Sequence, residues 1–483
     1  MQHHCTAPVS FPPILNFLVI PLNFRGQIHS FDLPAFDLRA SPALARIETM
    51  KNELKITGGR MISGTHEVHG NKNAALPMLA ATLLTDEPVT LENLPLIDDV
   101  RTTLELLRRI GAEVRLDEPA RRVTVCARDV TATTLPADLC VKVRATILFA
   151  GPLVARAGRI EIPATGGDPI GRRRIDTHIA GLAALGADFI RLEAGSGYGF
   201  ERHGALSGAD IILDEASVTA TENILMAAAS AEGETTIYNA ACEPHVQDLC
   251  AMLSAMGARV EGAGTNFIRI AGAKRLHGTT ARIGADYIDA GSYMVAALVT
   301  GGELTVRGVC DRDMRVLAKA FSKFGVRWTL DGDTLRLPGG QHLAVVNDIG
   351  GAIPKIEDGI WPSIPSDLMS VLIVLAIFSE GTTLFFEKMF ESRMYFVDNL
   401  INMGAKIVQC DPHRIVVSGS RAPGLEGCRM SSPDIRAGIA LVIASLGANG
   451  ESVIQNAQSI DRGYEDVVGS LVSLGASVER RLD

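Results

Sequence analysis

Six cationic residues occupy places where a protein could bind an anion, each in a loop or near the start of a helical pattern. They are Lys72, Arg144, Arg173, Arg393, Arg436 and Arg462. Asp286, Asp367 and Asp434 likewise precede apolar runs. A helix N-terminus presents free N–H groups and the positive end of the helix dipole. Several such ends converging on one cleft would bind a multiply charged anion, and we expect that cleft between two domains.

Six apolar segments must position these residues. They are NAALPMLAATLL, RATILFAGPLVA, TENILMAAASA, GSYMVAALV, DLMSVLIVLAIF and RAGIALVIASL. A helix that is apolar on every side must be buried, so each segment predicts an inner helix. A turn rich in Gly or Pro and a β-branched run follow each one, which predicts a strand.

A second repeated pattern divides the chain into units. An amphipathic helical run ends at a glycine and a strand-like run follows at once, with the glycines at Gly111, Gly186, Gly257, Gly325, Gly404 and Gly475. The intervals are 75, 71, 68, 79 and 71 residues. Glycine takes the left-handed conformation that ends a helix at little cost. We therefore predict six α/β units, arranged as three plus three in two globular domains, since 483 residues suit two domains.

Composition excludes some classes of function. The formal net charge of −9 disfavours nucleic-acid binding. The eight cysteines form no CxxC pair, which predicts a reducing cytoplasmic location and no metal site. The apolar run FPPILNFLVIPLNF near the N-terminus is short and broken by proline, so we expect no membrane insertion. Residues 1–49 lack the repeat pattern. We interpret them as a disordered extension, or as residues that result from an upstream start codon, with Met50 as the first residue of the folded protein. A docking peptide is the alternative interpretation.

Eight ordered motifs carry a resemblance to a known family. They are GNKNAALP, VRATILFAGPLVA, GGDPIGRRRIDTH, SVTATENILMAA, PSDLM, FESR, PDIRAGIALV and SIDRGYE, and they run from residue 70 to residue 465. Together they resemble the UDP-N-acetylglucosamine enolpyruvyl transferases. The match extends from about residue 52 to the end of the chain.

This resemblance implies an inside-out α/β barrel fold with six βαβαββ units in two pseudo-threefold domains. Residues 72–285 would form the first domain, and residues 50–71 with 286–483 the second. The family transfers the enolpyruvyl group of phosphoenolpyruvate to the 3-hydroxyl of UDP-N-acetylglucosamine and releases phosphate. This reaction is the first committed step of peptidoglycan synthesis, and it needs no cofactor or metal.

The resemblance also implies roles for single residues. Lys72, Arg173 and Arg462 would bind the donor phosphate, and Arg393 and Arg436 its carboxylate, with Arg144 nearby. Fixed Lys and Arg donors suit a ligand with both groups. The remaining substrate-binding positions that match are Asn73, Ser217, Val218, Met389 and Glu391. The loop GGDPIGRRRIDTH would act as a lid.

The resemblance assigns the proton transfers of this reaction to carboxyl groups. Asp367 matches the aspartate that contacts the sugar hydroxyl and is the candidate base, although its position alone suggests an ordinary helix cap. Asp434 would be a second carboxylate near the reacting centre. Asp168 stands where most relatives carry the cysteine that acts as the acid and that fosfomycin alkylates. A carboxylic acid can donate a proton, but its pKa lies near ~3.9 rather than ~8.5. We therefore expect a more acidic activity profile and resistance to fosfomycin.

Several positions depart from the family pattern and bear on the acceptor. They are Asp98, Thr219, Cys242, His245 and the segment around Trp361. We interpret His245 as a surface or structural histidine. A divergent paralogue with another nucleotide acceptor therefore remains open, as does a non-catalytic UDP-sugar-binding regulator; 5-enolpyruvylshikimate-3-phosphate synthase shares the fold but has different motifs. The retained base and cations favour the enzyme. The sequence carries no signal for the oligomeric state.

Overall fold

The computed structural model describes residues 52–193 and 196–482, so the expectation for residues 1–49 lies outside the described residues. The described chain is a two-domain α/β fold with six small sheets. Two separate clusters of buried side chains form its cores, one from residues 74–283 and one from residues 54–68, 242 and 287–478. We call these the first and second domain, and we propose the boundaries 72–285 and 50–71 with 286–483.

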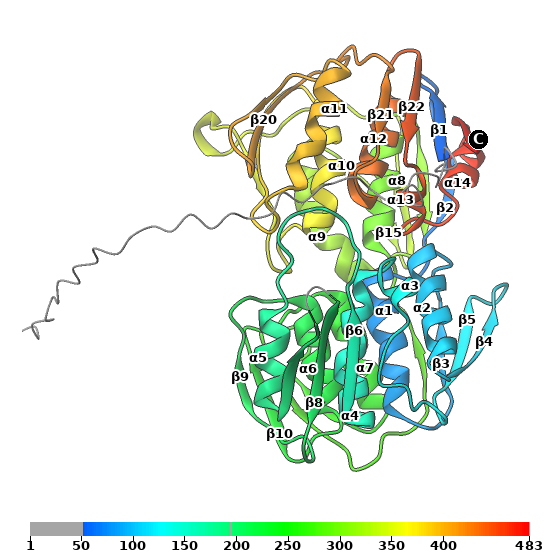
Figure 1. Ribbon diagram of the computed structural model, residues 1–483. Coiled ribbons are helices and arrows are strands. Elements are labelled where there is room, and N and C mark those ends of the chain that lie inside the picture. The colour runs from blue at the N-terminus through cyan, green and yellow to red at the C-terminus, as the bar shows by residue number, and fades with distance from the viewer. Residues whose placement is uncertain (1–51, 194–195, 483) are drawn as a thin grey trace, which may run out of the picture. The chain divides into compact units, whose positions relative to one another are not determined.

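Three sheets belong to the first domain (Figure 1). The strands are given in spatial order. The first sheet has β13 (Thr280–Arg282), β3 (Val89–Glu92), β5 (Arg122–Cys126) and β4 (Glu113–Asp117), and the second has β6 (Arg159–Pro163), β8 (Gly197–Arg202) and β7 (Ala187–Arg191). The third has β11 (Arg259–Glu261), β12 (Phe267–Ala271), β10 (Glu234–Tyr238) and β9 (Asp210–Ile212). Each sheet contains an antiparallel hairpin, and two of them add a parallel strand at one edge.

The other three sheets belong to the second domain. They are β21 (Arg429–Ser431), β22 (Glu451–Gln455), β1 (Asn52–Thr57) and β23 (Ser477–Leu482); β15 (Thr329–Asp331), β16 (Thr334–Leu337), β14 (Leu304–Arg307) and β2 (Gly64–Glu67); and β17 (Lys355–Glu357), β18 (Gly381–Phe386), β20 (Arg414–Gly419) and β19 (Ile407–Gln409).

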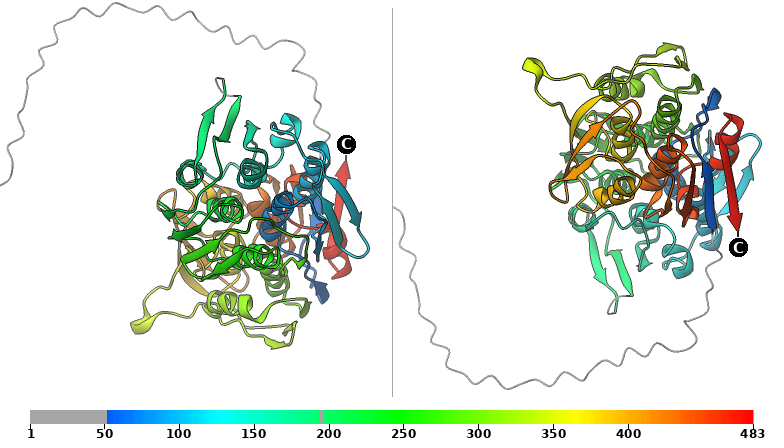
Figure 2. Two further views of the ribbon diagram at one scale, coloured as in Figure 1. Left: turned by 90° about the horizontal axis from the view of Figure 1, so that it is seen from below. Right: turned by 90° about the horizontal axis from the view of Figure 1, so that it is seen from above.

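The first strands of the chain pair with its last strands. β1 lies between β22 and β23, with Leu54 opposite Ile454 on one side and Arg480 on the other. β2 runs parallel to β14. The chain returns at its middle, where β13 pairs with β3. The chain therefore passes between the two sets of sheets twice, and Figure 2 shows β1 in blue beside β23 in red.

Six inner helices fill the domain interiors, as the apolar segments predict. They are α1 (Lys72–Ala81), α4 (Ala150–Ala157) and α6 (Val218–Ala228) in the first domain, and α8 (Tyr287–Thr300), α10 (Ser366–Ile377) and α12 (Ile435–Leu446) in the second. All twelve residues of α12 are buried, and α8, α10 and α12 pack on one another.

One segment differs from the prediction. Residues 144–149 form a 3₁₀ helix, η3 (Arg144–Phe149), before α4 begins. Pro152 lies in the first turn of α4 and has no N–H to donate to the preceding turn, which disfavours a continuous α-helix there.

Outer helices cover the inner ones, and every predicted glycine ends one of them. They are α2 (Asp98–Arg109), α5 (Asp176–Ala184), α7 (Pro244–Ala255), α9 (Asp311–Ser322), α11 (Val397–Asn402) and α14 (Val467–Ser473). In α9, Met314, Leu317 and Phe321 are buried at helical spacing. All six repeat glycines have positive φ, which confirms the predicted helix ends. The remaining short helices are η2 (Thr82–Leu84), α3 (Ala137–Cys140), η4 (Ile349–Gly351), η5 (Arg393–Phe396) and α13 (Gln458–Asp461).

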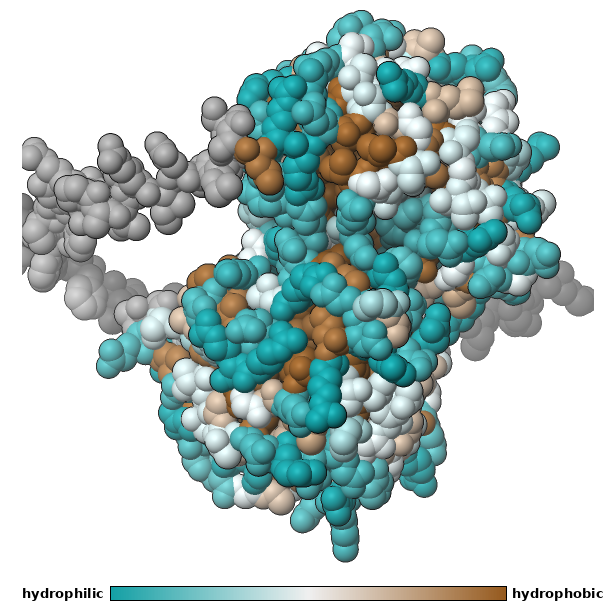
Figure 3. Space-filling view, turned by 90° about the vertical axis from the view of Figure 1, so that its right-hand side faces the viewer, coloured by the Kyte–Doolittle hydropathy of each residue, from teal (hydrophilic) through white to brown (hydrophobic). Residues whose placement is uncertain are grey.

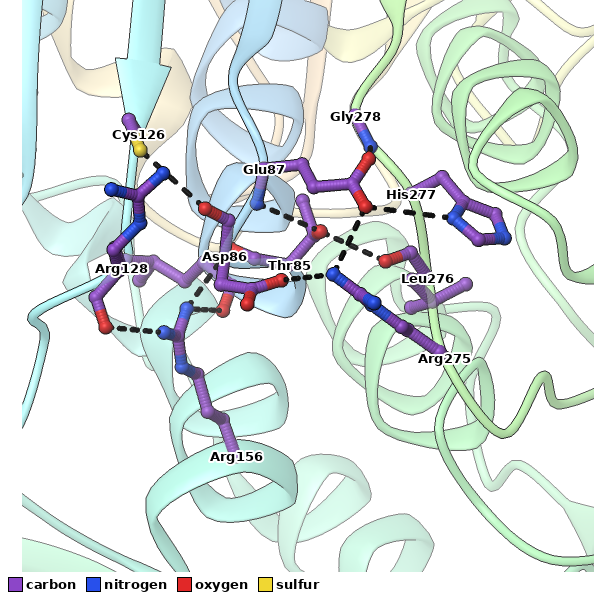
Figure 4. A network of polar contacts seen from close by, with 11 residues as sticks. Thr85, Asp86, Glu87, Cys126, Arg128, Arg156, Arg275, Leu276, His277 and Gly278 are labelled. Atoms are coloured by element: carbon purple, nitrogen blue, oxygen red, sulfur yellow. Dashed lines mark hydrogen bonds and ion pairs between the residues drawn. The ribbon is translucent and has the colours of Figure 1, made fainter.

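A polar network joins the repeats at one end of the first domain (Figure 4). The Arg156 guanidinium on α4 donates to the carbonyls of Leu83 and Thr85, each at 3.0 Å. Arg275 lies 3.1 Å from a Glu87 oxygen, and Gly278 donates to the other Glu87 oxygen. The two Arg156 bonds satisfy carbonyls in and just after η2, the short helix that follows α1.

On the face that Figure 3 shows, hydrophilic side chains lie between small apolar patches. Within the described ranges, no helix combines the length and the apolar character needed to cross a bilayer.

Candidate functional site

Lys72 opens α1 and is held in a buried ion pair. The Asn71 side chain caps this helix by accepting from the Asn73 backbone N–H at 2.7 Å. Lys72 is 9% exposed, and its Nζ lies 2.6 Å from Oδ2 of Asp99, which is 3% exposed in the first turn of α2. The fold of the first repeat thus places one cation and one carboxylate together.

Arg462 brings the second domain into this cluster. It follows α13, and its Nε donates to Oδ1 of Asp99 at 3.0 Å. Its Nη1 donates to Oδ1 of Asp168, in the glycine-rich loop, at 2.6 Å. Asp99 is not among the residues predicted from sequence, although it lies next to Asp98 in the segment LPLIDDV. Asp99 therefore joins two of the three predicted phosphate ligands across the domain boundary.

Asp367 is the centre of a second cluster. It is the second residue of α10, and Pro365 rather than Asp367 occupies the capping position, so the cap interpretation is wrong. Its Oδ1 accepts from Arg393 at 3.1 Å, and its Oδ2 lies 2.9 Å from Nη2 of Arg436. Burial by itself would raise the pKa of Asp367, but Arg436, Arg393 and Lys72 together hold that pKa well below its ordinary value. Asp367 is therefore ionised.

The two arginines around Asp367 have further N–H groups to donate. Arg393 Nε and Nη1 and Arg436 Nη1 are buried and have no hydrogen-bond partner within the described part of the chain. A buried donor without an acceptor costs about 1–3 kcal/mol. These groups are suited to a bound carboxylate, which accepts two or more hydrogen bonds.

The glycine-rich loop contributes Arg173. Arg144 donates to the carbonyl oxygen of Arg173, and the Gly166 N–H donates to the Cys140 carbonyl at 3.1 Å. Burial lowers the pKa of Arg173 to about 10, and neighbouring Arg144 adds to this effect. A guanidinium destabilised by burial and by other cations gains from a bound anion.

The same loop contacts the second domain. The Ser392 N–H donates to the Ile170 carbonyl at 3.1 Å, and the Arg172 N–H donates to Oε2 of Glu391 at 3.2 Å. A Cβ on Gly171, where φ is +129°, would lie 2.2 Å from the same Glu391 oxygen. Only glycine permits this close approach. Glu391 thus contacts the loop backbone.

Asp434 and Ser217 have mainly local contacts. Asp434 caps α12 and accepts from the backbone N–H groups of Arg436 and Ala437 at 2.7 and 2.9 Å. Burial raises its pKa, against the opposing charge of Arg393. Ser217 caps α6 by accepting from Ala220 at 3.4 Å. Asn73 and Val218 are only partly buried and Met389 is exposed. None of them joins the clusters around Asp99 and Asp367 through a described side-chain bond.

The positions that depart from the family pattern have partners of their own. Thr219 Oγ1 lies 3.0 Å from Nε2 of His178. Cys242 donates to the Trp361 carbonyl at 2.8 Å. His245 is 4% exposed, which agrees with the structural rather than the surface interpretation, and burial lowers its pKa to about 4. These residues pack beside the site and leave the two clusters intact.

The first prediction concerns Asp99. Replacing it in an Asp99→Asn variant leaves Lys72 without its buried counter-charge and Arg462 with Asp168 alone, which should cost about 3 kcal/mol of stability in denaturant unfolding. Inorganic phosphate should restore more stability to this variant than to the wild type, because it supplies the missing anion. The control is Asp98→Asn at the exposed neighbouring position. Equal phosphate effects in both variants would contradict the assignment.

The second prediction concerns the loop. Glu391→Ala removes the acceptor for the Arg172 N–H, a contact that we expect to contribute about 1 kcal/mol. Trypsin should then cleave after residues 172–174 about fivefold faster, as followed by mass spectrometry. Glu303→Ala, at an exposed position on another strand end, is the control. Unchanged cleavage would show that Glu391 does not hold the loop.

Comparisons with known proteins find similar sequences over most of the chain. Residues 56–471 match the family EPSP synthase (3-phosphoshikimate 1-carboxyvinyltransferase). The UDP-N-acetylglucosamine 1-carboxyvinyltransferase of Treponema denticola is 50% identical over 429 residues, covering 89% of this chain and 99% of that protein. The protein of the same name from Bradyrhizobium diazoefficiens is 48% identical, covering 88% and 97%.

Solved structures show the same fold. The enolpyruvyl transferase NikO from Streptomyces tendae superposes with a TM-score of 0.80 at 24% identity, covering 90% of this chain and all of that one. EPSP synthase from Acinetobacter baumannii gives a TM-score of 0.67 at 19% identity, covering 89% and all of that chain. With identities near one half over nearly the whole of its curated relatives, this chain belongs to the enolpyruvyl transferase family, among the UDP-N-acetylglucosamine 1-carboxyvinyltransferases.

Proposed function

We propose that this protein transfers the enolpyruvyl group of phosphoenolpyruvate to the 3-hydroxyl of UDP-N-acetylglucosamine and releases phosphate, as a step of peptidoglycan and cell-wall synthesis. The observation that carries the proposal is the arrangement of cations from both domains and from the loop around Asp99 and Asp367. Relatives at about 50% identity carry the name of this activity. We also propose a cytoplasmic location, since the seven described cysteines are free thiols.

The donor phosphate binds Lys72 and Arg462, and the glycine-rich loop adds Arg173. Lys72 and Arg462 share Asp99, and the pKa of Arg173 is lowered by burial and by Arg144. A phosphate offers more oxygen acceptors and more charge than the single carboxylate of Asp99, so it can engage all three cations together. The loop then excludes water from the bound donor.

The donor carboxylate binds the free N–H groups of Arg393 and Arg436. It competes with Asp367 for the same two guanidinium groups, and this competition raises the pKa of Asp367 from its depressed value. Asp367 becomes a stronger base as the donor binds, because a base whose pKa lies far below the working pH accepts a proton poorly. It then removes the proton from the sugar 3-hydroxyl, and that oxygen attacks C2 of the enolpyruvyl group.

Asp168 supplies the proton that the methylene carbon receives during this addition. Its carboxylate is held by Arg462 at 2.6 Å, and the donor phosphate competes for that arginine. The resulting tetrahedral adduct returns a proton from the same methyl carbon to the Asp168 carboxylate as the C2–O bond to phosphate breaks, which restores the enol ether and the acid form of Asp168. The arrangement therefore provides a base, an acid and an anion site around one reacting centre.

The third prediction tests the reaction itself. Purified protein with phosphoenolpyruvate should release phosphate when UDP-N-acetylglucosamine is added, and other UDP-sugars should release little. Asp367→Asn should lower kcat by about 10²–10⁴-fold, because it removes the base. Asp398→Asn, an exposed aspartate on the neighbouring α11, is the matched control. Phosphate release with a different acceptor alone would replace the proposed function.

The fourth prediction tests Asp168. An Asp168→Cys variant should be alkylated by fosfomycin over time, while the wild type should not react, because a carboxylate is a much weaker nucleophile than a thiolate. The wild-type activity profile should lie at lower pH than that of the variant, because a thiol keeps its proton to higher pH than a carboxylic acid. Mass spectrometry and pH–rate profiles measure these outcomes. Covalent labelling of wild-type Asp168 or coincident profiles would remove it from the acid role.

A further inference from the structure

Two carboxyl groups are buried next to each other near the start of α10, which carries Asp367. Asp358, which follows β17, and Glu387, which follows β18, each have no exposed surface. Oδ2 of Asp358 and Oε1 of Glu387 both accept from the Met389 backbone N–H, at 3.3 and 3.2 Å, so the two carboxyl groups lie side by side. Neither residue belongs to the motifs that match the family. Two ionised carboxylates in this position would repel strongly, with little water to screen them.

The surroundings of the pair supply hydrogen bonds but little positive charge. Asp358 accepts from the backbone N–H groups of Lys388 at 2.5 Å and Met389 at 3.3 Å. Glu387 Oε1 accepts from Met389 and Phe390, both at 3.2 Å. The two carboxyl groups share the Met389 N–H, so they compete for one donor. Neighbouring carboxyl groups can hydrogen-bond to each other only if one of them carries a proton.

The charged groups around Glu387 come from four further elements. Arg393 on η5 acts on it electrostatically and favours ionisation. Nδ1 of His413, in the turn before β20, lies 2.7 Å from the Glu387 carbonyl. Asp367 lies one residue beyond Ser366 on α10. The Lys388 side chain is directed to Glu357 on β17, 3.7 Å away. Burial and Asp358 outweigh Arg393 and raise the pKa of Glu387 from 4.5 to about 9.

The pair lies where two parts of the candidate active site begin. The Ser366 hydroxyl, directly before Asp367, lies 2.9 and 3.0 Å from the two oxygens of Glu387. The chain that leaves Glu387 reaches Glu391 and Ser392, which contact the glycine-rich loop, and then Arg393, which binds Asp367. The buried pair is therefore connected through one short segment to the guanidinium that holds the candidate base.

We propose that Asp358 and Glu387 share one proton, and that this protonated pair positions both the segment 387–393 and the start of α10 for catalysis. Both are positioning residues, since they act through Ser366, Glu391 and Arg393. The catalytic part of this proposal rests on the proposed function, whereas the shared proton does not. Loss of the proton would place two negative charges together and displace the segment that holds the loop and Arg393.

Unfolding measured against pH tests the shared proton without reference to activity. The folded wild type keeps the proton up to about pH 9, while the unfolded chain releases it near pH 4.5. The stability that this proton contributes is therefore fully present below pH 4.5 and is lost as pH rises towards 9. The Glu387→Gln variant presents an amide N–H to Asp358 and does not titrate there. The unfolding constant of the wild type, divided by that of the Glu387→Gln variant, should rise about tenfold for each pH unit between pH 6 and pH 8.

Two further variants keep this test decisive. Asp358→Asn supplies the N–H from the other partner and should remove the same pH dependence. It can therefore replace Glu387→Gln in this test if Glu387→Gln does not fold. Glu303→Gln, at an exposed position, should keep the wild-type dependence. A pH-independent ratio for both Glu387→Gln and Asp358→Asn would overturn the shared proton.

Steady-state kinetics tests the positioning role. At pH 7, Glu387→Gln should keep kcat/KM for phosphoenolpyruvate within about threefold of the wild type, because the neutral amide reproduces the hydrogen bond. Glu387→Ala should lower kcat/KM about a hundredfold and speed tryptic cleavage of the loop. Above pH 9 the wild type should lose activity that Glu387→Gln keeps. Equal losses in the Glu387→Gln and Glu387→Ala variants would refute positioning through the proton, and a wild type inactive with phosphoenolpyruvate would refute the proposed function instead.

Discussion

Cations that would repel one another must be held close together in this protein, and buried carboxylates make this possible. Asp99 pairs with Lys72 and Arg462, and Asp367 pairs with Arg393 and Arg436. Each carboxylate offsets the burial of two positive groups, which would otherwise be strongly destabilising. An anionic substrate can then take over part of this role, so the site is stable without the substrate and ready to bind it.

The repeated fold explains how residues from distant parts of the chain reach these clusters. Each inner helix is buried along most of its length, and the charged residues Lys72, Asp367 and Asp434 lie at the helix starts. The crossover of β1 and β2 into the second domain places the start of the chain beside its end. Lys72 and Arg462 consequently meet at Asp99 although they lie near opposite ends of the described sequence.

The glycine-rich loop and the segment 387–393 form a continuous set of contacts around the site. The loop reaches Arg462 through Asp168, and it reaches Glu391 and Ser392 through its backbone. The segment that receives the loop also carries Arg393, so closure of the loop and orientation of Asp367 depend on the same backbone. Hydrogen bonds to main-chain groups suit this purpose, because they fix position without adding net charge.

The sequence by itself determined the repeated architecture and the identity of most charged residues in the site. Helix-ending glycines such as Gly404 and uniformly apolar helices such as α12 reflect local preferences that adjacent residues express in any context. The ordered motifs then indicated the family and with it the inside-out α/β barrel fold. The boundaries of α4 were less predictable, because Pro152 changed the helix type within one apolar segment.

Only the tertiary structure decided which charges pair. An aspartate at the start of a helix caps it by default, yet Asp367 binds two arginines while Asp434 does cap its helix. Asp99, Glu391 and the Asp358–Glu387 pair have partners that lie far away in sequence. Electrostatic energy depends on distance and burial, and neither quantity is fixed by sequence spacing until the chain has folded.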